Sequence, residues 1–309
     1  MIAASIALAC CVLLLGHLAG PLLMRARWPA RLPGTAATLW TAATAGTALA
    51  LAGLGLLGLV WPSTPGHRLV DWLADCLDDK HAITLAAALT SALLLTAGAI
   101  ALRLAVPRVV HTLRERRAHR EMLDMVARDL AGTPDVRVLD HPTPLIYCLP
   151  ARERPIVVTT GALDRLEAAE VEAVLAHERA HLRQRHHLLL MLADALHSAL
   201  PWLRTLRLAH DILPGLLELA ADDSAVRRHG KAPLIGALQK LAITSCSTGA
   251  LAVNPATAQI ARLRVARLTY PQLFPGLSHA RPLSWIAVVT AVGVPVVLAT
   301  LGLLLPLVC

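Results

Sequence analysis

Charged and apolar residues are separated along this chain into long blocks. Four stretches contain no Lys, Arg, Asp or Glu, and they cover residues 1–24, 32–67, 81–102 and 282–309. About 20 apolar helical residues cross a bilayer core, so each stretch is long enough for one span. The pattern predicts four transmembrane helices. For the first stretch a cleaved signal peptide is the alternative, although a basic N-terminal region is lacking.

The composition agrees with a membrane protein. Hydrophobic residues make up 56% of the 309 residues and charged residues 16%, and the mean hydropathy is +0.58. Soluble globular proteins carry roughly 25% charged residues, which excludes that class. Intrinsic disorder needs low hydrophobicity and is excluded as well.

The net charge of +8 reports membrane orientation. Arg25, Arg27 and Arg31 follow the first apolar stretch, and residues 103–120 hold six Arg and one Glu. Basic loops stay on the cytoplasmic side, so both termini of this multi-pass cell-membrane protein are expected outside and residues 103–281 inside. The run at 114–120 fits an anchor near anionic membrane lipid. No aromatic residues interleave it, so direct nucleic-acid binding is not expected.

These blocks predict three units and a fold class. Residues 1–106 are expected to form three transmembrane helices with short loops, residues 107–281 a cytoplasmic domain, and residues 282–309 the fourth transmembrane helix. The fold class is a mainly α membrane protein with an inserted α+β domain. Pro201 and the pair Pro214-Gly215 are expected to break helices. The elements expected in the insert are helices over 111–130, 166–200 and 216–228, strands over 136–139, 145–149 and 156–160, and two helices before Pro271.

The sequence His177-Glu178-Arg179-Ala180-His181 lies within the expected helix 166–200. Residues four apart share a helical face, so both imidazoles can reach one tetrahedral zinc ion. Glu178 is offset by about 100° and can address a water molecule held by the metal. This is the arrangement of a zinc hydrolase, with Glu178 as the general base. The alternative is a histidine-rich, solvated helix face, since His186, His187 and His197 follow.

Glu218 and Asp222 are the candidates that complete the site. A catalytic zinc needs a third protein ligand and an open fourth position. Glu218 would complete a two-histidine, one-glutamate set, and Asp222, one turn later, would hold a ligand histidine by its free ring nitrogen. The alternative for Glu218 is an exposed carboxylate at a helix end. The flanking leucines favour a buried setting, where an unpaired carboxylate is costly.

Together, the run His-Glu-Arg-Ala-His-Leu-Arg-Gln-Arg-His-His at 177–187 and Glu-Leu-Ala-Ala-Asp at 218–222 resemble the BlaR/MecR family of membrane metallopeptidases. The similarity extends to residues 142–147 and 154–160. The resemblance implies a gluzincin-like domain with Zn²⁺ as the cofactor, with His177, His181 and Glu218 as ligands and Glu178 as base. It also implies a sheet edge near 145–149 that binds substrate by strand addition, and a BlaI/MecI-like repressor as substrate in a signal-transduction role.

The chain also departs from that family. The receptors carry a penicillin-binding domain after the last span, whereas this chain stops at Cys309, and it has no Ser-x-x-Lys. Related membrane peptidases that process prenylated or heat-shock substrates, in membrane-protein quality control, form an alternative; they often carry His-Pro where this chain has Asn254-Pro255. A non-catalytic transducer with a structural zinc is a third interpretation. A homodimer and a disulfide between Cys76 and Cys309 stay open.

Overall fold

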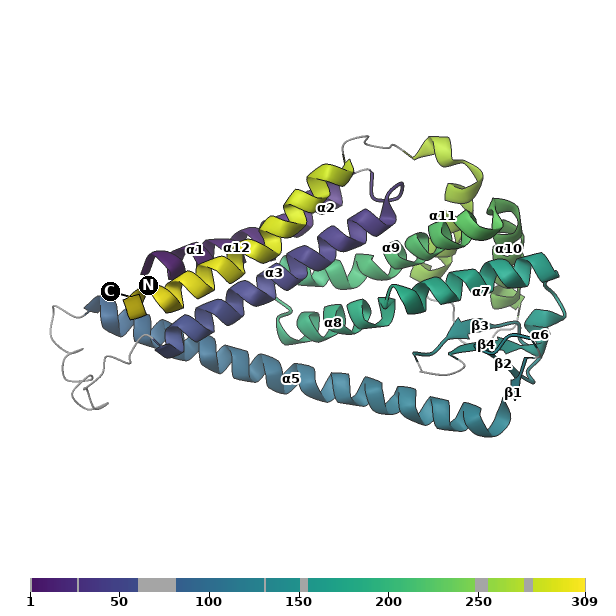
Figure 1. Ribbon diagram of the computed structural model, residues 1–309, viewed down its shortest axis with the longest axis horizontal. Helices are drawn as coiled ribbons and strands as arrows, with labels where there is room; N and C mark the ends of the chain where they lie inside the picture. Colours follow the sequence, from purple (N-terminus) through teal and green to yellow (C-terminus); the bar gives the residue numbers. More distant parts are fainter. Residues whose placement is uncertain are drawn as a thin grey trace.

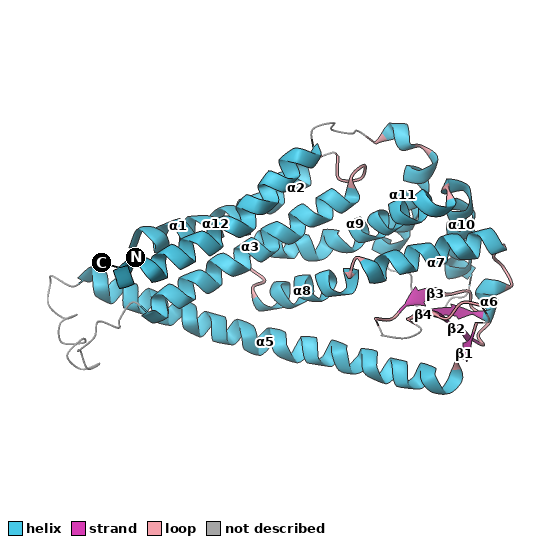
Figure 2. Cartoon of the chain, viewed as in Figure 1, coloured by secondary structure: helices cyan, strands magenta, loops and turns pink. Residues whose placement is uncertain are grey.

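The computed structural model describes residues 2–26, 28–60, 82–130, 132–150, 155–247, 255–274 and 280–308. Helices dominate it and a small sheet lies at one end, which confirms the mainly α class (Figure 2). Cys76 and Cys309 lie outside the described residues, so the question of a disulfide between them stays open.

Three helical segments form a bundle at the end of the molecule away from the sheet. The first runs without interruption through α1 (Ile2–Leu13), the π-helical turn η1 (Leu14–Ala19) and α2 (Gly20–Arg25). The others are α3 (Pro33–Val60) and α12 (Ala280–Val308). Figure 1 shows α1, α3 and α12 side by side, with both chain termini at one end of the bundle.

Among the described residues, three helices are long and apolar enough to cross a membrane. They cover Ala3–Arg25, Pro33–Leu57 and Trp285–Leu304 and correspond to the first, second and fourth predicted spans. The predicted span over 81–102 falls on the N-terminal part of α5 (Ala82–Val126). The count of four spans stays a prediction.

Helix α5 connects the bundle to the sheet. It is 45 residues long and continues past Pro107, and Figure 1 shows it running the length of the molecule. The charged helix expected over 111–130 is its C-terminal part, which ends at Val126. Residues 128–129, expected to be helical, instead form β1 (Arg128–Asp129), which pairs with the next strand.

The sheet has four strands in the order β1-β2-β4-β3. The predicted strands are confirmed to within one or two residues as β2 (Val136–Leu139), β3 (Ile146–Cys148) and β4 (Ile156–Thr159). β2 and β4 are parallel, and β3 is antiparallel to β4. β3 is therefore at one end of the described sheet, where the sequence predicted a substrate-binding edge.

The helix expected over 166–200 is two helices, so that prediction is wrong. After the short α6 (Thr160–Leu163), α7 (Ala168–Arg183) ends before Gln184 and α8 (His186–Ala199) begins at His186. Arg185 between them has φ 52°, a left-handed conformation. Such a break is unusual at a residue other than glycine, so the sequence pattern did not predict it.

Helix α9 (Arg204–His229) also differs from its prediction, because it continues through Pro214 and Gly215. The chain instead reverses at Leu200–Leu203, around Pro201. Leu213, Leu216 and Leu217 are almost fully buried, so the packing of this stretch outweighs the cost of a proline within it. The two helices expected before Pro271 are confirmed as α10 (Lys231–Ser247) and α11 (Pro255–Thr269).

One hydrophobic core joins the bundle to the helices that follow the sheet. Trp40 of α3 is 1% exposed and packs in one cluster with residues of α8 and α9. The buried members of that cluster are Ala36, Ala37, Trp40, Ala193, Ala209, Leu213, Leu216 and Leu217. The helix that carries Glu218 therefore rests directly on a bundle helix.

Candidate metal centre

Helix α7, which carries the predicted zinc motif, is fixed at its start and along its outer face. Glu167 and Glu170 form a reciprocal capping box, and Lys240 of α10 donates to Glu170 Oε2 at 2.7 Å. Arg179 points away from the motif and makes two hydrogen bonds to Asp135, at 2.7 and 3.0 Å. The charged residue within the motif thus ties the helix to the sheet.

His177, His181 and Glu218 come together as the sequence predicted. The two Nε2 atoms are 3.0 Å apart, and each lies 3.4 Å from an oxygen of Glu218. Ligand atoms about 2.1 Å from a tetrahedral zinc are about 3.4 Å from one another. The three side chains therefore already present a triangle of the right size for one face of a zinc site.

Hydrogen bonds on the far sides of the rings support a cation at that triangle. His177 Nδ1 lies 2.9 Å from Asp222 Oδ1, and the Asp222 side chain is fully buried. Asp222 thus contacts the ring of His177, the contact expected from the sequence, while its role in holding a metal ligand stays a prediction. Since an acceptor occupies Nδ1–H, the lone pair at Nε2 of a neutral His177 faces the Nε2 of His181. Two imidazole nitrogens and a carboxylate that converge in this way form a donor set that suits zinc.

The pKa values of the three side chains reflect the same contacts. Burial lowers the pKa of His177, but the hydrogen bonds to Asp222 and Glu218 outweigh it and raise the pKa to about 9. Burial and the charge of His177 lower the pKa of His181 to about 4. Burial would raise the pKa of Glu218, yet His177 and Arg264 bring it to about 2. The three shifts show that His177, Asp222, Glu218 and Arg264 interact as one electrostatic cluster.

Arg264 of α11 was not predicted and belongs to the site. Its guanidinium lies 2.9 Å from Glu218 Oε2 and makes two hydrogen bonds to Asp222, at 2.7 and 2.9 Å. Its side chain is 14% exposed. Arg264 therefore balances the charge of the buried Asp222 and of Glu218, which is 33% exposed, from a helix more than 40 residues away in sequence.

Glu178 faces the edge strand β3. Its carboxylate shares a hydrogen bond with the thiol of Cys148, and burial raises the pKa of both groups, with the charge of Glu178 adding to the effect on the thiol. Side chains alternate along a strand. Tyr147 accordingly points the other way, with its hydroxyl 3.1 Å from His119 Nε2 of α5. The proposed base thus lies between the triangle and the strand edge.

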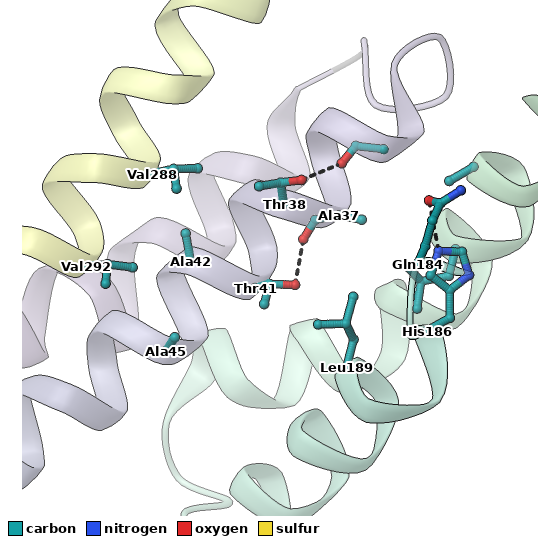
Figure 3. Close-up of a pocket in the computed structure, with 13 residues that line it drawn as sticks. Ala37, Thr38, Thr41, Ala42, Ala45, Gln184, His186, Leu189, Val288 and Val292 are labelled. Carbon is teal, nitrogen blue, oxygen red and sulfur yellow. Dashed lines mark hydrogen bonds between the residues drawn. The ribbon is translucent and has the colours of Figure 1, made fainter. Parts of the chain in front are cut away.

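His186 also contacts one of the candidate ligands. The sequence had placed it only on a possible histidine-rich helix surface. It is 2% exposed, and its Nδ1 lies 2.9 Å from His181 Nδ1. On its other side is a cavity of about 360 Å³ between α3, α8 and α12. Figure 3 shows His186 at the edge of this cavity, with Thr38 and Thr41 of α3 and Val288 and Val292 of α12 facing it.

Comparison with known proteins matches the region that contains this site. Residues 112–242 match the family described as Peptidase family M48. A Protease HtpX homolog of Moorella thermoacetica is 40% identical over 69 residues, which are 21% of this chain and 23% of that protein. Protease HtpX homolog 2 of Methanosarcina mazei is 49% identical over 43 residues, 14% of this chain and 15% of that protein.

A Protease HtpX homolog of Thermoplasma acidophilum is 33% identical over 82 residues, 24% of this chain and 26% of that protein. The chain thus spans about a quarter or less of the length of these curated relatives. No solved structure matches the chain. The region that holds His177, His181 and Glu218 is therefore similar to Peptidase family M48, a family of metal-dependent peptidases, while the BlaR/MecR type stays a prediction.

Proposed function

We propose that this protein is a membrane-bound zinc endopeptidase with its active site at the junction of α7, α9 and the sheet edge. The observation that carries the proposal is the triangle of His177 Nε2, His181 Nε2 and the Glu218 carboxylate, with sides of 3.0 to 3.4 Å. The match of residues 112–242 to Peptidase family M48 supports it independently.

The chain's own residues have distinct roles in the proposed reaction. A bound zinc ion supplies Lewis-acid chemistry, since it acidifies water and polarises a carbonyl group. Glu178 takes the proton of the attacking water and passes it to the leaving amine. Asp222 holds the ring of His177, and Arg264 keeps Glu218 and Asp222 ionised. The edge of β3 aligns the substrate backbone beside Glu178.

The test uses the full-length protein in detergent micelles with denatured casein as substrate. Glu178→Gln should retain one zinc ion per chain, measured by atomic absorption, and lose cleavage by at least about 100-fold, the lower range for a general base. Glu172→Gln is the matched control, because Glu172 lies on the same helix with 53% of its side chain exposed. Cleavage that survives in Glu178→Gln would overturn the mechanism and favour a non-catalytic transducer.

The substrate that we propose is a cytosolic repressor of the BlaI/MecI type. The basic segments at Arg25–Arg31 and at residues 103–120 support a cytoplasmic active site, where such a repressor is present. Incubation of proteoliposomes with a purified repressor of this type should give one defined cleavage, absent with Glu178→Gln.

Broad proteolysis of membrane proteins is a second candidate. The specific observation in its favour is that the relatives reported above are named as HtpX-type proteases. It predicts many cleavage sites in a denatured membrane protein reconstituted into the same vesicles and no preference for the repressor. The two substrates offered together at equal concentration separate the candidates.

A further inference from the structure

The break between α7 and α8 brings a third histidine to the metal centre. Residues five apart in an uninterrupted α-helix are separated by about 140° around the axis, so His186 would face away from His181. The left-handed conformation of Arg185 interrupts the helix between them. His186 Nδ1 consequently lies 2.9 Å from His181 Nδ1, and the two rings meet edge to face.

A chain of hydrogen bonds continues from His186 to helix α9. His186 Nε2 lies 3.2 Å from Gln184 Oε1, and Gln184 Nε2 donates to Ser224 Oγ at 3.0 Å. Ser224 is 4% exposed and donates its hydroxyl proton to the carbonyl oxygen of Ala220. The chain therefore runs from the backbone of α9, through two side chains, to the rings of His186 and His181.

The hydrogen bond that Ser224 donates determines which atom is the donor in each of the other hydrogen bonds of this series. Because the Ser224 hydroxyl has one proton and gives it to Ala220, it can only accept from Gln184, which places the amide nitrogen of Gln184 there. The amide oxygen then faces His186 Nε2, which must be the protonated nitrogen.

The same assignment of protons extends from His186 to the candidate ligand His181. A neutral His186 that is protonated at Nε2 has a free lone pair at Nδ1 and accepts from Nδ1–H of His181. The Nε2 lone pair of His181 is then free, and that atom faces His177 and Glu218.

We propose that His186 is a positioning residue of the zinc site, which holds His181 in the tautomer that presents Nε2 to the metal. This inference rests on the proposed metal centre. It implies that the two ligand histidines are held by different chemistry, His177 by the carboxylate of Asp222 and His181 by a neutral imidazole. Partners of this kind orient the ring and raise its affinity for metal.

Zinc affinity tests the proposal without reference to activity. The full-length protein carries Glu178→Gln to prevent self-cleavage, and zinc is titrated in detergent micelles against a chelating dye. His186→Leu removes the acceptor and should weaken zinc binding about 10- to 100-fold. His186→Asn restores an acceptor for His181 Nδ1–H and should bring the affinity back to within about threefold of the parent. His187→Leu, the same change at the next residue, is the control and should leave the affinity unchanged.

Further measurements separate the proposal from its competitors. Gln184→Leu cuts the chain one step further from the ligand and should weaken binding in the same direction, which keeps the test decisive if His186→Leu does not fold. With Co²⁺ in place of zinc, the visible band should keep its position in His186→Asn; a large shift would mean direct ligation by His186 and would overturn the proposal.

Equal zinc affinity of His186→Leu and the parent would overturn the proposal as well, and so would zinc binding by His186→Asn that is as weak as that of His186→Leu. A parent protein that binds no zinc at all would instead refute the proposed metal centre.

Discussion

Arg264 and Asp222 form a two-bond ion pair beside the candidate metal centre, with Nε 2.9 Å from Oδ2 and Nη2 2.7 Å from Oδ1. Asp222 is fully buried. A buried carboxylate that loses its cationic partner keeps the full cost of desolvation. Loss of the Arg264 cation should therefore destabilise the folded protein as well as change the charge of the candidate site.

Replacing Arg264 with Leu should lower the free energy of unfolding by about 3 kcal/mol, the lower range for breaking a buried pair. Arg264→Lys keeps the charge without the two-bond geometry and should lose less. Denaturant unfolding in mixed micelles measures both. Arg207→Gln changes an exposed arginine of α9 and should stay within about 0.5 kcal/mol of the parent; an equal loss there would contradict a specific role for Arg264.

Two helical glycines of the bundle, Gly46 and Gly293, differ in the space around them and serve as a test position and its control. A Cβ atom at Gly46 of α3 would lie 2.1 Å from the carbonyl oxygen of Ala291 in α12, whereas nothing lies within 4 Å of one at Gly293. Gly46→Ala should therefore push the two helices apart and cost about 1 to 3 kcal/mol. Gly293→Ala should be neutral or slightly stabilising, because alanine favours the helix. Equal thermal midpoints of the two variants in detergent would show that the helices do not pack this closely.

The ion pair between Asp135 and Arg179 should make stability depend on pH. Hydrogen bonds from Arg179 lower the pKa of Asp135 in the folded protein, although burial opposes this. The stabilisation is therefore complete above the unfolded pKa of about 3.9 and is lost as the pH falls through the lower folded value.

Asp135→Asn should thus cost about 1 kcal/mol or less at pH 7, since both side chains are about a third exposed. The difference from the parent should shrink in unfolding experiments carried out at progressively more acidic pH. Asp164→Asn, at an exposed position without such a partner among the described residues, should show no such trend. If the difference in the free energy of unfolding between Asp135→Asn and the parent instead grew at more acidic pH, the expected stabilisation by this ion pair would be contradicted.

The thiol of Cys148 should resist alkylation while the protein is folded. Burial and the neighbouring charge of Glu178 raise its pKa, and only the thiolate reacts. Iodoacetamide at pH 8 should therefore modify Cys148 slowly, as followed by peptide mass spectrometry. Glu178→Gln removes the negative charge and should speed the reaction, while Glu172→Gln should not. An unchanged rate in Glu178→Gln would show that the two side chains do not interact.

The convergence of the candidate ligands was predictable because it depends on short spacings within helices. His177 and His181 are one turn apart, and so are Glu218 and Asp222, and helix geometry alone aligns each pair. The three strands of the insert were predictable for a similar reason, since proline and glycine bound each apolar run. Local sequence patterns thus predicted both the histidine pair and the carboxylate pair of the candidate site.

The remaining parts depend on tertiary packing that leaves no local pattern. The helix break at the left-handed Arg185 is marked by neither glycine nor proline. Conversely, burial of Leu213, Leu216 and Leu217 keeps α9 helical through Pro214. Arg264 approaches from α11, past the end of the region that matches the peptidase family. Such contacts between distant segments are invisible in a single sequence.

The cluster around Trp40 makes the position of Glu218 depend on a candidate membrane span. The floor beneath the helix of Glu218 includes Ala36, Ala37 and Trp40, which belong to a candidate membrane span. A chain in which this segment has not docked against α9 would lack part of the packing that positions Glu218. Substitutions in the candidate span are therefore expected to disturb the candidate metal centre, although the two lie far apart in the sequence.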